Sequence, residues 1–149
     1  MNVHIKGPNE VLTRSEIKTA LNFFASKLMS GRLCDALSIS LIHDPKMKLD
    51  GMVCWSDKHY RPRCFEMMLN PNLGKRKQLL ALAHEMVHVK QYAKGELAYS
   101  SKLGLEKWHG EYIKEDQFSY YEKPWEIEAY GREVGLYHMY MSWKRSLKS

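Results

Sequence analysis

The sequence predicts an α+β fold in which three main helices pack on a small, mostly antiparallel sheet. Apolar residues recur at helical spacing in three stretches, and short alternating runs bounded by Pro, Asp, Asn and Gly lie between the first two of them. A chain of 149 residues, 44% of them hydrophobic, can form one substantial core but is too short for two. We therefore expect a single domain covering residues 1–149.

The first predicted helix begins near Thr13. Apolar residues between Val11 and Leu28 follow helical spacing, and Thr13-Arg-Ser-Glu16 matches a capping box, in which each terminal side chain bonds the other's backbone amide. Gly31 is a suitable stop for this helix.

Three short strands are predicted next, because the apolar period changes. They cover residues 37–43, 51–55 and 63–69, and the turn residues Asp44-Pro45 and Asn70-Pro71 end the first and the last. Such short runs favour a meander of neighbouring strands over parallel crossovers.

The most specific motif is His84-Glu85-x-x-His88, within a predicted helix over residues 75–92. Four residues advance an α-helix by about one turn, so His84 and His88 project from the same face and can bind one metal ion. Glu85 is the next residue round the helix and can reach a metal-bound water without being a ligand. That is the position of a general base.

This helix is apolar around most of its circumference, which predicts that it is buried. Two histidines and a glutamate in such a helix need polar partners, and a cation would supply them. We therefore interpret His84 and His88 as zinc ligands and Glu85 as a catalytic residue.

A final helix is predicted from Pro124, in the first helical position, to about Ser146. Residues 96–106 are expected to be irregular, and residues 107–113 to form a short strand. The final helix offers a third ligand, because a catalytic zinc site usually has three protein ligands. Glu126 and Glu128 lie about 160° apart around the helix, so only one can face the histidines.

The choice between Glu126 and Glu128 stays open on periodicity. The predicted apolar stripe of the helix, which both glutamates flank, consists of Ile127, Tyr130, Val134, Tyr137 and Met141. Gly131 and Gly135 lie on the Glu128 side and would permit close approach of another element, which favours Glu128. Glu126 can instead be explained as a first-turn carboxylate that favours the helix dipole.

The HExxH helix, a strand ending in Leu69-Asn-Pro and a later Pro124-Trp-Glu-Ile-Glu-Ala129 together resemble small gluzincin-type zinc metallopeptidases. More closely, they are similar to SprT-like and phage-encoded metallopeptidases, over roughly residues 63–133. The gluzincin glutamate ligand is commonly followed by Ala, as Glu128 is, so the resemblance implies the ligand set His84, His88 and Glu128. It also implies a compact zincin fold, with the metal between the second and third main helices.

The family resemblance implies hydrolysis of peptide bonds, with an extended substrate pairing along the strand at residues 63–69. Glu85 would take a proton from the attacking water, and Tyr112, Tyr120 or Tyr121 could supply a second oxyanion donor. SprT-like relatives often carry a third histidine and a cysteine zinc ribbon. This chain lacks the ribbon cysteines, and His109 is kept as a competing ligand.

Composition narrows the remaining possibilities. Three cysteines without a C-x-x-C pair argue against a zinc ribbon and against a disulfide framework. No apolar run resembles a signal peptide or a membrane span. We therefore expect a cytoplasmic protein. A net charge of +6 is compatible with nucleic acid as a partner, but a solvated basic surface is the favoured explanation, because most of the lysines and arginines are spread along the chain. The alternatives to a peptidase are a binding module with structural zinc and a zinc amidase.

Overall fold

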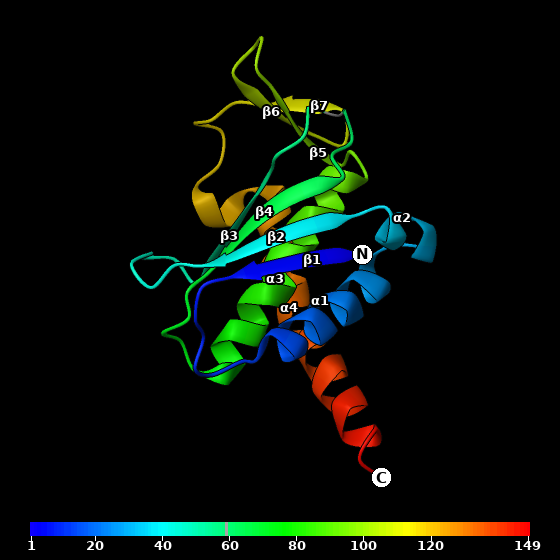
Figure 1. Cartoon of the computed structure of the whole chain (residues 1–149). Coiled ribbons are helices and arrows are strands. Elements are labelled where there is room, and N and C mark those ends of the chain that lie inside the picture. Colours follow the sequence, from blue (N-terminus) through cyan, green and yellow to red (C-terminus); the bar gives the residue numbers. More distant parts are fainter. Residues whose placement is uncertain (59) are drawn as a thin grey trace.

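The computed structural model describes residues 1–58 and 60–149, which form two sheets and four α-helices (Figure 1). The main sheet contains β1 (Asn2–Lys6), β2 (Ser38–His43), β3 (Gly51–Trp55) and β4 (Cys64–Leu69). The helices are α1 (Arg14–Leu28), α2 (Gly31–Asp35), α3 (Lys75–Ala93) and α4 (Pro124–Ser146). A second sheet contains β5 (Leu97–Ser100), β6 (Leu105–Trp108) and β7 (Glu111–Ile113), and a 3-10 turn, η1 (Tyr120–Glu122), precedes α4. The predicted α+β class is confirmed.

The main sheet is mixed, with strand order β1-β2-β4-β3. β1, β2 and β4 are parallel, and β3 runs antiparallel to β4. The predicted meander is therefore right only for β3 and β4. Parallel neighbours need a long connection, and α1 and α2 provide one between β1, a strand that the sequence analysis missed, and β2.

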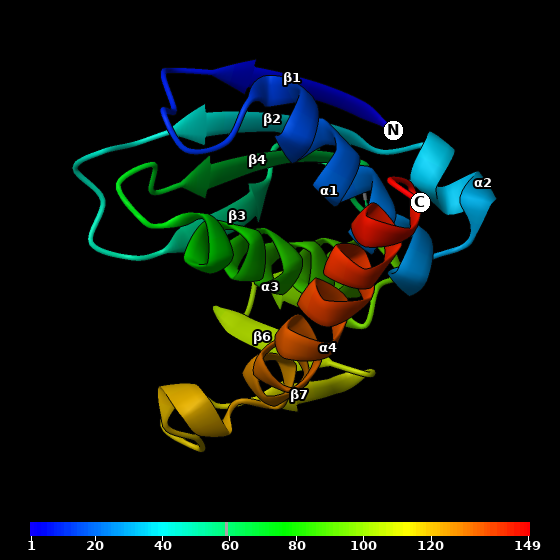
Figure 2. The same cartoon turned by 90° about the horizontal axis from the view of Figure 1, so that it is seen from below.

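One face of the main sheet carries the core. Alternate side chains of its strands are buried, among them Ile39, Leu41, Phe65 and Met67, while Ser40 and Glu66 lie on the opposite face. α1 and α3 lie side by side over the buried face, and α4 packs against both helices on the side away from the sheet (Figure 2). This arrangement buries α3 between the sheet and α4.

Local sequence signals set the helix ends. The capping box of Thr13 and Glu16 is present, but α1 ends at Leu28, because Ser30 starts α2 by capping the amide of Leu33. α3 ends before Gly95, whose φ of +73° is typical of a left-handed residue that terminates a helix.

The second sheet is antiparallel and contains β5, β6 and β7 in that order. It occupies much of the stretch predicted to be irregular. The short strand predicted over residues 107–113 is interrupted by His109 and Gly110, whose φ values of 47° and 87° form the tight turn between β6 and β7. The apolar alternation in these three strands is too weak to identify them from sequence. Their pairing with one another stabilises them.

α4 buries a different face from the predicted one. Trp125, Glu126, Ala129, Leu136 and Tyr140 are buried. Ile127, Tyr130 and Val134, members of the predicted apolar stripe, are 58%, 42% and 43% exposed. Within the described residues, no helix is long and apolar enough to cross a bilayer.

Candidate metal centre

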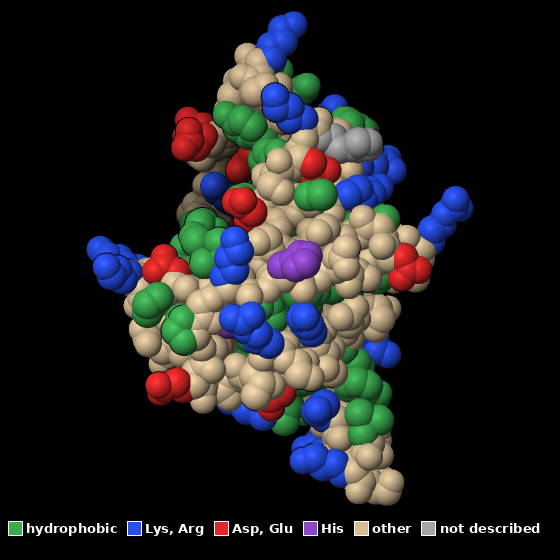
Figure 3. Space-filling model, viewed as in Figure 1, with side chains coloured by type: hydrophobic (Ala, Val, Ile, Leu, Met, Phe, Trp, Pro, Cys, Tyr) green, Lys and Arg blue, Asp and Glu red, His purple; other side chains and the backbone are tan. Residues whose placement is uncertain are grey.

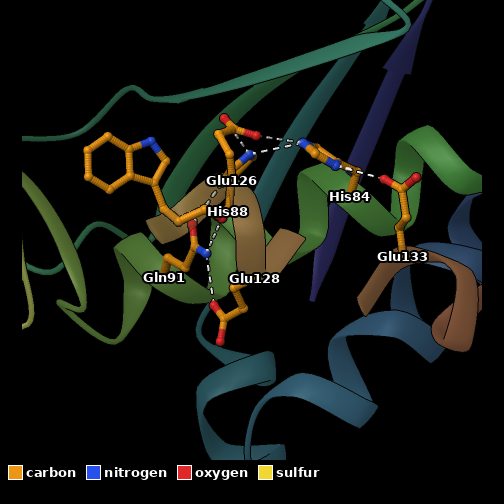
Figure 4. A network of polar contacts seen from close by, with 7 residues as sticks. His84, His88, Gln91, Glu126, Glu128 and Glu133 are labelled. Carbon is orange, nitrogen blue, oxygen red and sulfur yellow. Dashed lines mark hydrogen bonds and ion pairs between the residues drawn. The ribbon is translucent and has the colours of Figure 1, made fainter. Parts of the chain in front are cut away.

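α3 presents His84 and His88 on the same side, as their spacing predicts. Their Nε2 atoms lie 3.2 Å apart, and both side chains are buried between α3 and α4 (Figure 4). Two imidazole nitrogens at this distance can bind one ion.

Hydrogen bonds at the other ring nitrogen orient both imidazoles. Nδ1 of His84 donates to Oε2 of Glu133 at 2.8 Å, and Nδ1 of His88 donates to Oε1 of Gln91 at 2.8 Å. When Nδ1 of a neutral imidazole carries the proton, Nε2 has a free lone pair. Both lone pairs are then available for a metal, and such outer-shell partners are common at metal sites.

Glu126, in the first turn of α4, completes the group. Its Oε2 lies 3.2 Å from Nε2 of His84, and its Oε1 lies 3.3 Å from Nε2 of His88. Ligands placed 2.0–2.1 Å from a tetrahedral zinc ion are separated by about 3.3 Å. The three side chains could therefore hold one metal ion.

The group also contains an unsatisfied polar atom. Oε2 of Glu126 is buried and has no hydrogen-bond partner in the described part of the chain, although Nε2 of His84 lies nearby. A bound cation would satisfy this oxygen together with the two nitrogen lone pairs. A metal thus fits the residues present.

In the absence of a metal, the histidines of this group bind protons instead. Burial opposes the charged forms, yet hydrogen bonds to Glu126 and Glu133 raise the pKa of His84 to about 9. Burial likewise acts against ionisation of Glu126, but the two histidines lower the pKa of this carboxyl to about 2. The pKa of His88 is also raised, chiefly by Glu126 acting against burial.

The prediction that Glu128 lies with the histidines is wrong. Oε1 of Glu128 accepts from Nε2 of Gln91 at 2.8 Å (Figure 4), and its Oε2 pairs with Lys90 Nζ at 2.9 Å. Gln91 in turn bonds His88, so Glu128 acts on the site through Gln91 and does not contact the histidines.

Gly131 and Gly135 do not mark a contact face of α4. A Cβ atom added to Gly131 or Gly135 would meet nothing within 4 Å, so no element approaches that side of α4. The face that contacts the histidines instead carries Glu126, Tyr130 and Glu133, at positions i, i+4 and i+7. This spacing was readable in the sequence, but it was overlooked.

Glu85 follows His84 on the buried helix and lies against the start of β3. A Cβ atom at Gly51 would stand 3.1 Å from Cγ and 3.3 Å from Oε1 of Glu85. Burial raises the pKa of Glu85, while the neighbouring histidines lower it. The structure therefore places the predicted general base next to an edge strand.

His109 lies outside the group. It occupies the exposed turn between β6 and β7, where its ring packs edge-on against Trp108. In the described part of the chain, His84, His88 and Glu126 are the one set of three His, Cys, Asp or Glu donors that converge closely enough for a metal.

The three tyrosines predicted as possible oxyanion donors, Tyr112, Tyr120 and Tyr121, lie in different places in the structure. Tyr120, in η1, lies near Glu126 and Tyr130, and burial together with these neighbours raises its pKa. The ring of Tyr130 packs edge-on against His84, with centroids 4.5 Å apart. Tyr121 packs on Tyr130, whereas Tyr112 lies on β7, under Lys107. Of the three, Tyr120 is placed beside the proposed metal ligand.

Comparison of the chain with protein-family models, curated proteins and solved structures finds no match.

Proposed function

We propose that this chain is a zinc-dependent metallopeptidase with His84, His88 and Glu126 as metal ligands and Glu85 as general base. The observation that carries the proposal is the convergence of the Nε2 atoms of His84 and His88 with the Glu126 carboxylate at 3.2–3.3 Å. Zinc bound there would lower the pKa of a coordinated water and polarise a substrate carbonyl. The resemblance of the HExxH helix to SprT-like metallopeptidases supports the same assignment.

Glu85 is suited to proton transfer. Burial raises the pKa of its carboxyl and so strengthens it as a base. It adjoins His84 in sequence without joining the ligand group. Glu85 would thus take a proton from the attacking water and pass it to the leaving amine.

β3 is the strand suited to hold an extended substrate. Residues 63–69 were expected to do so, but β4 is paired on both sides, with β2 and β3. β3 is an edge strand, and it begins at Gly51 beside Glu85. A peptide added to this edge would pass the general base, and Tyr120, near Glu126, is a candidate donor to the oxyanion.

The alternative functions have less support. A purely structural zinc site requires a fourth protein ligand, and His109, the candidate for it, lies on a remote turn. On the face shown in Figure 3, Lys and Arg side chains are scattered among neutral and acidic ones, which does not favour a dedicated nucleic-acid surface there. An exposed edge strand suits an extended peptide better than the small substrate of a closed amidase site.

The test is metal-dependent cleavage of an unfolded protein. We expect about one zinc per chain, cleavage that stops with chelator and returns with zinc, and loss of cleavage in Glu85→Gln with zinc content retained. Glu66→Gln, an exposed carboxylate on the opposite face of the sheet, is the matched control and should cleave normally. Undiminished cleavage by Glu85→Gln would remove the mechanism, and a chain without bound metal would remove the proposal.

A further inference from the structure

A groove lined by aromatic side chains lies between the end of β3, the end of α3 and the second sheet. It has a volume of about 370 Å³. Its aromatic lining consists of Trp55, Tyr60, Tyr92, Tyr99 and Tyr112. Four of these five are at least 36% exposed, with Tyr60 the most exposed at 77%. Exposed aromatic rings gathered in one hollow are typical of a binding site, because single domains rarely leave such surface uncovered.

The groove is aligned with the proposed metal centre. Tyr92 follows His84 and His88 on the same face of α3, at positions i, i+4 and i+8. Its ring packs on Trp55, the last residue of β3, with centroids 4.9 Å apart. β3 therefore leads from Gly51, beside Glu85, to Trp55 in the groove, a length of about 13 Å at the usual rise of a strand.

The charge of the groove is positive. Lys58 and Lys107 line it, and no Asp or Glu is among the described lining residues. The ammonium group of Lys107 lies 5.2 Å from the centre of the Tyr112 ring. Glu106, the neighbour of Lys107 on β6, stands opposite Tyr99 and lines an adjoining hollow that shares Tyr99 with the groove. The groove thus combines aromatic faces with cations.

We propose that this groove binds an aromatic side chain, flanked by acidic residues, of the peptide being cleaved. The inference rests on the proposed function and names its substrate class. A peptide paired along β3 with its scissile bond at Glu85 would place a residue about four positions away in the groove. Rings of the groove would stack on that side chain, and the lysines would pair with the neighbouring carboxylates.

Binding can be tested without turnover, in zinc-loaded Glu85→Gln. The probe is a fluorescent, unstructured decapeptide with one Tyr flanked by Asp, compared by anisotropy with peptides in which Tyr is Ala or the Asp residues are Lys. We expect binding at least about tenfold tighter for the Tyr/Asp peptide. Lys107→Glu should reverse the preference between the Asp and Lys peptides. Tyr99→Ser should lower the affinity for the Tyr/Asp peptide about three- to tenfold. Lys102→Glu, an exposed lysine outside the groove, should change neither.

The cut site provides a second readout in the active protein. Shifting Tyr along the peptide should shift the cleaved bond with it, at a constant spacing of about four residues. Equal affinity for all three peptides would overturn the inference while leaving Glu85-dependent cleavage of unfolded proteins intact. Tighter binding of a ten-nucleotide single strand, weakened by Lys107→Glu, would also overturn it, in favour of nucleic acid. Selective peptide binding without cleavage by the wild type would support the groove and reject the peptidase.

Discussion

Two carboxylates two residues apart on α4 have different neighbours, and this difference predicts different effects on zinc affinity. Glu126→Gln removes a charge 3.2–3.3 Å from both histidines, so affinity should fall by more than the ~10–100-fold typical of losing an outer-shell partner. Glu128→Gln, which touches Lys90 and Gln91 instead, should cost at most about tenfold. Titration with a competing chelator measures both, and equal losses would contradict the assignment of Glu126.

Gly51 lies where an added side chain would contact Glu85, the proposed general base. A Cβ atom there would lie 3.1 Å from Glu85 Cγ, so Gly51→Val should displace the carboxylate. We expect cleavage to fall about tenfold or more, because general-base catalysis depends on position. Zinc content should stay at the wild-type level, since Gly51 does not touch the ligands. Gly31→Val is the control, because a Cβ atom at Gly31 in α2 would meet nothing within 4 Å, and cleavage by Gly51→Val at the wild-type rate would refute the contact.

At the scale of secondary structure, features that depend only on neighbouring residues could be predicted from the sequence. The His84/His88 pair follows from one helical turn, and the α1 cap follows from Thr13 and Glu16. The third ligand does not, because tertiary packing selects the face of α4 that meets α3. β1 was missed for a related reason, since it pairs with the distant strand β2. The second sheet was missed because its strands are short and their apolar alternation is weak, although each pairs with its neighbour in sequence.

The buried face of α4 can be tested by a pair of substitutions. Leu136 is 1% exposed, so Leu136→Ala should lower the free energy of unfolding by about 2–5 kcal/mol. Ile127, although it belongs to the predicted apolar stripe, is 58% exposed, so Ile127→Lys should change stability by no more than about 0.5 kcal/mol. Urea denaturation followed by circular dichroism measures both values. A large loss for Ile127→Lys with a small one for Leu136→Ala would restore the face predicted from periodicity.

At the scale of the whole molecule, packing α3 between the main sheet and α4 places ionisable groups in a shared interior. His84, His88 and Glu126 are each less than 9% exposed, and their charges are balanced only by one another and by adjoining polar groups. Protons and a metal ion therefore compete for the same lone pairs. The stability of the fold should depend on pH in opposite directions with and without metal.

In the metal-free protein, stability should fall as pH rises from 6.5 to about 9. Hydrogen bonds to Glu126 and Glu133 outweigh burial and raise the pKa of His84 from 6.5 to about 9, so the native state holds a proton that the unfolded chain releases. This contribution is complete below pH 6.5 and is lost through pH 9, on the order of 3 kcal/mol. The raised pKa values of His88 and Glu85 act in the same direction.

Zinc should reverse this dependence, because its ligands bind without protons and its affinity rises with pH. Urea denaturation in chelator and in excess zinc, at several pH values from 6 to about 9, measures both slopes. His84→Gln should remove most of the metal-free slope as well as the gain on adding zinc, because one residue carries both effects. Metal-free stability that stays constant or rises over this range would show that the histidines are not held protonated by Glu126 and Glu133, and the electrostatic account of the site would fail with it.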